Sequence, residues 1–149
     1  MRSAMIESQM REFCSLQQRI NRVYDQYARM RGCTYTNGLI LSLIAREPQC
    51  TQKRIHEITL LPKQTINNVV TSFCRQGLVE LVELPEDRRS KAIHLTDKGE
   101  EAARPYVSAI DNAEYEAMAG LTPDQRKALI AAMEAYCRTF AEAMGVQAS

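Results

Sequence analysis

The sequence predicts a mainly α-helical protein with one small β-hairpin. Apolar residues recur every three or four positions over six segments, which is the spacing of a helix that buries one face. Residues 78–84 and 91–95 instead read as short strands, because Ile93 and Leu95 share one face at a period of two. Apolar residues make up 45% and charged residues 25% of the 149 residues, which is the balance of a globular chain. We therefore expect a single domain over residues 1–149.

The first and last helices are predicted from narrow apolar stripes. Residues 6–30 carry Phe13, Leu16, Ile20, Val23, Tyr27 and Met30, and residues 123–144 carry Ile130, Met133, Cys137, Phe140 and Met144. Steps of three and four are typical of helices that pack along a seam. Thr122 and Gln125 stand as a capping box, with Pro123 at the first helical position. The stripes either pack between two subunits or are buried within one chain.

Between these helices the sequence predicts three shorter helices, the hairpin and a long helix. The shorter helices cover residues 37–46, 52–58 and 62–76, and the long helix begins at Asp97. Thr51 and Thr96 are suitable N-caps, and Gly77 stands where a helix usually ends. The turn at residues 59–61 has the length found in a helix-turn-helix. Followed by a hairpin, this order is that of a winged helix-turn-helix.

The helix at residues 62–76 has an unusual outer face. Ile66, Val69, Val70 and Phe73 lie on one side and must face the core. The other side holds Lys63, Gln64, Thr65, Asn67, Asn68, Thr71, Ser72 and Arg75. This face has no acid, and its amides and hydroxyls can bond to base edges and phosphates. We predict that it reads DNA; the alternative is a polar helix surface without a partner.

The segment between the two predicted strands, residues 85–91, is expected to form the hairpin tip. It carries the cations Arg88, Arg89 and Lys91. Cations at such a tip can enter a DNA minor groove, where the potential is negative. Asp87 can fix a neighbouring guanidinium by a bidentate bond. The alternative is a solvated turn that contacts nothing.

These segments resemble the MarR family of regulators. Residues 51–55 (TQKRI) and 62–68 (PKQTINN) look like its helix-turn-helix. Residues 87–91 (DRRSK), then His94, Leu95, Thr96 and Gly99, are similar to its wing and the start of its next helix. The resemblance covers about residues 51–99. It implies a DNA-binding lobe at residues 35–99 and a helical dimerisation region at residues 1–34 and 100–149.

The resemblance also implies a homodimeric regulator, expected to be a repressor, that binds double-stranded DNA at a pseudo-palindrome. Asp87 and Arg89 match the paired wing residues of the family, and residues 63–68 match its contact segment. The predicted DNA-binding residues are Lys63, Gln64, Thr65, Asn67, Asn68, Ser72 and Arg75 of the recognition helix, Asp87, Arg88, Arg89 and Lys91 of the wing, and Thr51, Gln52 and Lys53 of the helix before the turn.

Family members commonly leave DNA when a small phenolic or aromatic compound binds, or when a thiol is oxidised. Tyr24, Tyr27 and Tyr35 fall near the expected ligand pocket, although they equally suit a core or an interface. No pocket residue is carried over from the family. Cys14 is a candidate redox thiol, because it lies in the first helix with Arg11 one turn before it. It stands about one turn closer to Tyr35 than in peroxide-sensing relatives, and the alternative is a packing role.

Other classes of protein find little support in the sequence. The five cysteines are widely spaced without a C-x-x-C pair, so we expect no metal site and no cofactor. Two histidines, no nucleophile–base pattern and no glycine-rich phosphate loop argue against an enzyme. A winged-helix protein-interaction module without DNA binding remains an alternative.

Two further observations concern where the charged residues lie along the chain and how long its apolar runs are. Residues 51–98 carry eight Lys or Arg against six acids, whereas residues 99–149 carry four against eight. The basic charge therefore lies with the segment that is predicted to meet DNA. No run approaches the roughly 18 apolar residues that span a bilayer, and the N-terminus lacks a signal-peptide core. We expect a cytoplasmic protein that does not contact a membrane.

Overall fold

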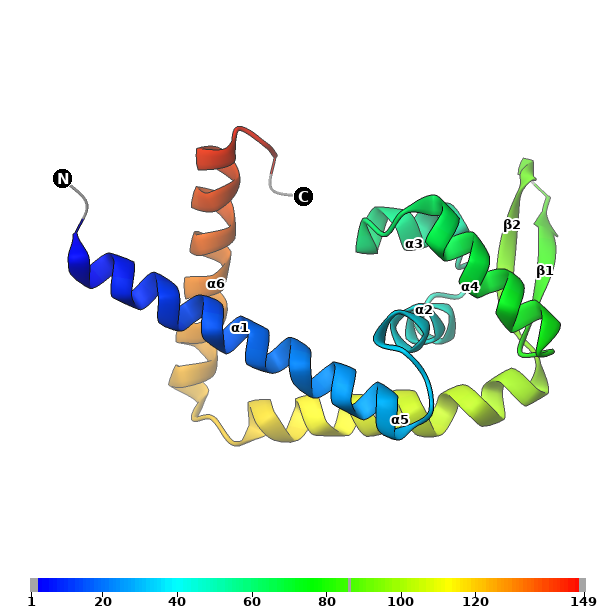
Figure 1. Cartoon of the computed structure of the whole chain (residues 1–149), viewed down its shortest axis with the longest axis horizontal. Coiled ribbons are helices and arrows are strands. Elements are labelled where there is room, and N and C mark those ends of the chain that lie inside the picture. The colour runs from blue at the N-terminus through cyan, green and yellow to red at the C-terminus, as the bar shows by residue number, and fades with distance from the viewer. Residues whose placement is uncertain (1–2, 86, 148–149) are drawn as a thin grey trace. The chain divides into compact units, whose positions relative to one another are not determined.

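The computed structural model describes residues 3–85 and 87–147, without the side chains of residues 87–89. In these residues it contains six helices and one antiparallel hairpin, so the predicted fold class is confirmed (Figure 1). The elements are α1 (Ala4–Met30), α2 (Tyr35–Arg46), α3 (Gln52–Thr59), α4 (Lys63–Arg75), β1 (Val79–Leu84), β2 (Asp87–Leu95), α5 (Asp97–Ala119) and α6 (Pro123–Met144). The chain forms two compact units, Met1–Val107 and Ser108–Ser149. None of the described helices is long and apolar enough to cross a bilayer.

Threonine caps start α2 and α3. The Thr34 hydroxyl accepts the backbone N–H of Asn37 at 3.2 Å, so α2 begins two residues before its predicted start. The Thr51 hydroxyl accepts the N–H of Arg54 at 3.1 Å, as predicted for α3. Such a cap contributes about 1 kcal/mol by satisfying one of the free N–H groups at a helix start.

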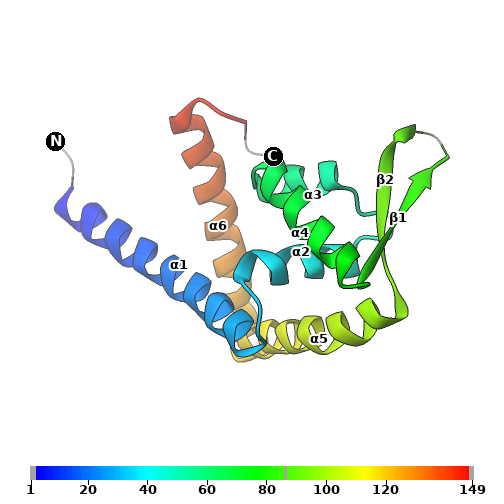
Figure 2. The same cartoon turned by 45° about the vertical axis from the view of Figure 1, so that its right-hand side comes forward.

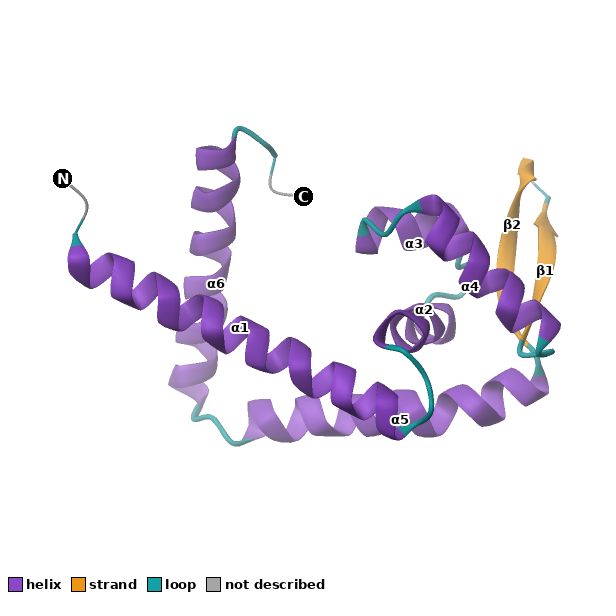
Figure 3. Ribbon diagram, in the orientation of Figure 1, coloured by secondary structure: helices purple, strands orange, loops and turns teal. Residues whose placement is uncertain are grey.

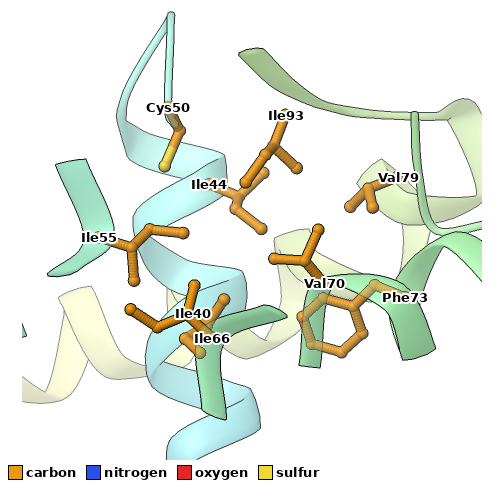
Figure 4. Packing of buried hydrophobic residues seen from close by; sticks show 9 residues of the cluster. All are labelled: Ile40, Ile44, Cys50, Ile55, Ile66, Val70, Phe73, Val79 and Ile93. Carbon is orange, nitrogen blue, oxygen red and sulfur yellow. The ribbon is translucent and has the colours of Figure 1, made fainter. Parts of the chain in front are cut away.

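The core of the first unit lies between α2, α3, α4 and the hairpin. Figure 4 shows the side chains of these elements pointing toward one another. The buried cluster consists of Ile40, Ile44, Cys50, Ile55, Ile66, Val70, Phe73, Val79 and Ile93. Burying each large apolar side chain contributes about 1.5–3 kcal/mol, so this cluster fixes the outer face of α4 by holding its inner face.

The hairpin differs from its prediction in the second strand. In β1 and β2, shown in orange in Figure 3, Val79 pairs with Leu95 and Glu83 with Lys91, but Leu84 pairs with Asp87. The register therefore shifts, and residues 88–90 bulge from the ladder. The predicted tip at residues 85–91 was thus too long, because β2 begins at Asp87. The charged residues at the start of β2 do not alternate with apolar residues, so the period-2 pattern that predicts a strand is absent there.

The hairpin is joined to the start of α3 as well as to α4. The backbone N–H of Ile93 donates to the carbonyl of Cys50 at 2.7 Å, and Thr51 forms a β-bridge with Ala92. Figure 2 shows the hairpin rising from the C-terminal end of α4. The wing is therefore tied to both helices of the helix-turn-helix.

The second unit contains the end of α5 and all of α6. The predicted capping box is confirmed, because the Thr122 hydroxyl accepts the N–H of Gln125 at 3.2 Å and the Gln125 side chain accepts the N–H of Thr122 at 2.9 Å. The Arg126 guanidinium donates to the carbonyls of Met118 and Leu121. These bonds close the corner between the two helices.

Candidate nucleic-acid interface

The outer face of α4 is exposed and free of acids. The exposed residues are Lys63, Gln64, Asn67, Asn68, Ser72 and Arg75. Ile66, Val70 and Phe73 of the same helix are buried, as the helical period predicts. Thr65 and Thr71, which were expected to face outward, are half-buried because they lie at the edge between the two faces. The structure thus brings six of the seven predicted α4 site residues onto one exposed surface.

Two hydrogen bonds organise this surface. The Gln64 Nε2 donates to Asn68 Oδ1 at 2.8 Å, and the Gln76 Nε2 donates to Ser72 Oγ at 3.0 Å. Both bonds span one helical turn. The first bond fixes the orientation of the Gln64 side-chain amide. The carbonyl oxygen of that amide takes no part in the bond. Orienting amides before a partner arrives reduces the ordering cost of binding.

A groove lies between the start of α3 and the hairpin. It has a volume of about 310 Å³ and is lined by Thr51, Gln52, Lys53, Leu81, Ser90 and Lys91. Four of these residues, Thr51, Gln52, Lys53 and Lys91, were predicted to contact DNA. Lys53 lies 3.9 Å from Glu57, an exposed ion pair that is worth little in water. Lys53 and Lys91 thus bring two cations into one groove without a carboxylate in its lining.

For the remaining wing residues the structure describes the backbone but not the side chains. Asp87, Arg88 and Arg89 lie in β2 next to or within the bulge. Their side chains lie outside the described part of the chain. Their predicted contacts with DNA therefore stay predictions.

The side chains that build the turn between α3 and α4 were not predicted from the sequence. His56 Nδ1 lies 2.7 Å from the carbonyl oxygen of Leu61, and the Thr59 hydroxyl donates to the carbonyl of Ile55 at 2.7 Å. Leu60 takes a left-handed backbone conformation, with φ at 55°. The one signal in the sequence was the lack of a glycine at residues 59–61.

A pocket of about 390 Å³ lies between the α1–α2 loop, α2, the end of α4 and α5. Its lining is Arg31, Gly32, Cys33, Asn37, Gly38, Leu41, Phe73, Gln76, Leu78, Ala102 and Tyr106. None of the three tyrosines expected near a pocket belongs to this lining. Tyr27 instead contacts Tyr106, with ring centroids 5.3 Å apart, and Tyr24 lies 6.4 Å from Tyr35.

The polar groups of this pocket are mostly neutral. Burial raises the pKa of the Tyr106 phenol, and nearby Cys33, Tyr27 and Tyr35 raise it further. Burial also raises the pKa of the Cys33 thiol, although the charge of Arg31 opposes this. The thiol donates to the carbonyl of Ala28 at 3.4 Å, as a protonated sulfur does. Arg31 is therefore the one charged residue in the lining, and it suits an anion.

The candidate redox residue, Cys14, is exposed on α1. It lines a shallow groove together with Gln17, Gln18, Ile20 and Asn21, so the groove holds no charged side chain. No group of three His, Cys, Asp or Glu side chains could hold a metal ion within the described residues.

Together the helix pair, the hairpin and the acid-free face of α4 define a winged helix-turn-helix DNA-binding protein. A model of the MarR family matches residues 31–90, which span α2, α3, α4, β1 and the first part of β2. No curated protein sequence matches the chain closely enough to count as a relative.

Solved structures match nearly the whole chain. A MarR family regulator from Neisseria meningitidis is similar at 26% identity and a TM-score of 0.76, over 92% of this chain and 96% of that one. Staphylococcus aureus MarR, solved with salicylate and kanamycin, is 19% identical with a TM-score of 0.72, over 93% and 95%. S. aureus MepR, solved in a complex with DNA, is 21% identical with a TM-score of 0.67, over 86% and 94%.

The chain is similar to the MarR family of DNA-binding transcriptional regulators over residues 31–90 and has the fold of solved MarR family regulators. This is a family of regulators and not of enzymes.

Proposed function

We propose that the protein is a homodimeric repressor that reads a pseudo-palindromic DNA site with the exposed face of α4. The observation that carries this proposal is the acid-free surface of six polar residues that the core holds outward. A carboxylate there would repel phosphates, whereas Asn and Gln can pair bidentately with adenine. The similar S. aureus MepR was solved in a complex with DNA.

In this proposal α4 enters the major groove. Gln64, Asn67 and Asn68 read base edges, while Lys63 and Arg75 contact phosphates, with Thr65 and Ser72 at the margins. Phosphates also suit the N-terminus of α4, where backbone N–H groups and the helix dipole favour negative charge.

The groove between α3 and the hairpin holds the sugar-phosphate backbone in the same proposal. Lys53 and Lys91 neutralise phosphate charge, and Thr51 and Gln52 add hydrogen bonds from the start of α3. The wing residues Asp87, Arg88 and Arg89 reach the flanking minor groove. These assignments follow from the family resemblance and from the position of β2 beside α3.

The test of the reading face is Asn67→Ala, with Gln9→Ala on α1 as the matched exposed-amide control. Affinities are measured for duplexes that each differ from the preferred site by one base pair. Asn67→Ala should lose about 1–3 kcal/mol of preference at particular base pairs, and Gln9→Ala should lose none. A uniform loss over all duplexes would instead place Asn67 on a phosphate.

For dimerisation we propose residues 1–34 and 100–149, with residues 35–99 as the DNA-binding lobe. Large apolar side chains are exposed in rows on both terminal helices, which is unfavourable in a monomer. They include Leu16, Ile20 and Val23 of α1, and Ile130, Phe140 and Met144 of α6. A second copy of the chain would cover both rows and set two copies of α4 in successive major grooves.

The dimer is tested by light scattering during size-exclusion chromatography. Ile20→Glu places a charge in the apolar row and should give a monomer. Gln18→Glu, an exposed neighbour on the same helix, should leave the dimer intact. A wild-type protein that elutes as a monomer at micromolar concentration would refute this part of the proposal.

We further propose that a small aromatic acid occupies the pocket beside α4 and releases the protein from DNA. The volume of about 390 Å³ lies in the range of small-molecule sites, and Phe73, Leu41 and Tyr106 supply apolar walls around Arg31. Phe73 and Gln76 lie at the end of α4, so an occupant touches the recognition helix directly. The similar S. aureus MarR was solved with salicylate.

Salicylate is a suitable probe for this pocket. It should release wild-type protein from DNA in a saturable manner, and Arg31→Gln should weaken that effect. Arg29→Gln is the matched control, because Arg29 lies two residues before Arg31, at the end of α1, but pairs with Asp25 at 2.8 Å. Equal responses of the two variants would show that Arg31 does not bind the acid.

Oxidation of Cys14 is a second route of release, favoured by the exposure of its thiol on α1. Under peroxide the wild-type protein should then leave DNA, and Cys14→Ser should stay bound. A Cys14→Ser protein that is released as readily as wild type would remove this route.

A further inference from the structure

The turn between α3 and α4 is closed without glycine. Leu60, the residue after α3, has φ 55° and ψ 15°, a left-handed conformation that a leucine side chain disfavours. Glycine is the usual residue at such a helix end. The Leu60 side chain is 78% exposed, so packing of that side chain does not hold the turn. Other bonds must compensate for the unfavourable backbone conformation.

Two side chains of α3 supply those bonds. The His56 Nδ1 lies 2.7 Å from the carbonyl oxygen of Leu61, and since a carbonyl only accepts, this nitrogen carries the proton. The Thr59 hydroxyl donates to the carbonyl of Ile55 at 2.7 Å and accepts the N–H of Leu61 at 3.2 Å. Both backbone polar groups of Leu61 are thus held by side chains of α3.

Leu61 stands where these bonds matter most for α4. The next residue is Pro62, which precedes the helix, has no backbone N–H to donate, and accepts the N–H of Ile66 at 3.1 Å. Pro62 also provides no side-chain cap for α4. The direction of the first turn of α4 therefore depends on how Leu61 is held. Lys63 and Gln64 of the proposed reading face lie in that turn.

We propose that His56 is a positioning residue for DNA recognition. By holding the carbonyl of Leu61, it orients the first turn of α4 toward the bases without contacting DNA itself. This inference rests on the proposed function of α4. A direct phosphate contact by the His56 ring would give a different pattern of results, which the experiment separates.

Two substitutions of similar polarity discriminate between these roles. The amide nitrogen of Asn lies close to the place of Nδ1, whereas that of Gln reaches the place of Nε2. His56→Asn can therefore keep the bond to Leu61, while His56→Gln and His56→Ala lose it. Ile44→Val, in the core of the same lobe, serves as a control that lowers stability without touching the turn.

The first measurement is affinity at two salt concentrations, for a duplex that the wild-type protein enriches from random DNA and for a scrambled duplex. His56→Ala and His56→Gln should lower the ratio of the two affinities roughly tenfold, the order of one lost base contact. Their salt dependence should equal that of wild type, because no phosphate contact is lost. His56→Asn and Ile44→Val should keep the wild-type ratio. Any one of three results would overturn the proposal. They are a smaller salt dependence for His56→Ala, an equal loss of affinity on both duplexes, and an affinity ratio that His56→Asn does not restore.

The second measurement does not need DNA. Amide hydrogen exchange over residues 57–66 should quicken in His56→Ala, return to the wild-type rate in His56→Asn, and stay unchanged in Ile44→Val. Unchanged exchange in His56→Ala would overturn the positioning role, whatever the DNA result. A wild-type protein that prefers neither duplex would refute the proposed function, and exchange would still decide whether His56 orients α4.

Discussion

The phenol of Tyr106 on α5 lies directly on Gly38 of α2, so close that a Cβ at Gly38 would overlap the phenol oxygen. Tyr106 is 5% exposed, and the ring of Tyr27 on α1 lies 5.3 Å from it. Three helices of the first unit therefore meet at one tyrosine, and the glycine makes room for it. The same phenol lines the pocket beside α4.

Gly38→Ala should lower the free energy of unfolding by about 1–3 kcal/mol, because overpacking forces Tyr106 or the helices apart. Alanine is the better helix former, so the intrinsic propensity alone predicts the opposite sign. Urea denaturation measures the difference. Gly120→Ala is the control, since the nearest atom to its added Cβ would lie at 3.4 Å. A Gly38→Ala protein as stable as wild type would show that α5 does not press on α2.

Ser42→Ala should raise the free energy of unfolding by about 1 kcal/mol. The Ser42 side chain is 3% exposed on α2, and its hydroxyl has no hydrogen-bond partner among the described residues. Removing an unpaired buried hydroxyl removes its desolvation cost. Thermal unfolding measures this, with exposed Ser15→Ala as the control. A lower melting temperature for Ser42→Ala would mean that the hydroxyl finds a partner in solution.

Cys50 should make the protein less stable at alkaline pH. Burial, assisted by the Glu47 carboxylate and opposed by Arg54, raises the pKa of the Cys50 thiol from 9.0 to about 11. Because the folded pKa lies above the unfolded one, this contribution is complete below pH 9 and is lost as the pH rises toward 11. The loss amounts to roughly 2 kcal/mol at the upper end.

The measurement compares urea denaturation of wild type and Cys50→Ala at pH 8 and at pH 10.5, with a reductant present. Every other ionisable group is the same in both proteins, so the difference between them isolates the thiol. Wild type should lose more stability than Cys50→Ala over this interval. An equal loss in both proteins would assign the alkaline destabilisation to other groups.

Arg89→Ala should weaken DNA binding on all sequences and reduce the salt dependence of the affinity. A minor-groove or phosphate contact releases counterions, and losing one contact lowers the slope by roughly one unit. Arg104→Ala on α5, which pairs with Glu100 at 4.0 Å, is the control for loss of an exposed arginine. An unchanged slope for Arg89→Ala would remove the wing from the interface.

Much of the fold was predictable because its signals are local. The capping box at Thr122 and Gln125 and the cap at Thr51 depend on residues a few positions apart. The inner and outer faces of α4 follow from the helical period, which placed Ile66 and Val70 in the core. Thr65 was predicted to face outward but is half-buried, because it lies at the edge between the two faces.

The rest depended on contacts between distant segments or on special backbone geometry. The start of β2 at Asp87 was hidden by a run of charges without alternation. The packing of Tyr106 on Gly38 joins residues that no local pattern relates. The bond between His56 and Leu61 lies beside the left-handed backbone of Leu60, and no local pattern in the sequence predicts either of them.

The most direct test of specific DNA binding is fluorescence anisotropy with labelled DNA from upstream of the protein's own gene. A scrambled duplex of the same composition is the control, and both are titrated at two salt concentrations. Saturable binding to the upstream DNA, at least about 10³-fold tighter than to the control, is the predicted result. No binding to either duplex at low salt would contradict the central claim that the exposed face of α4 reads DNA.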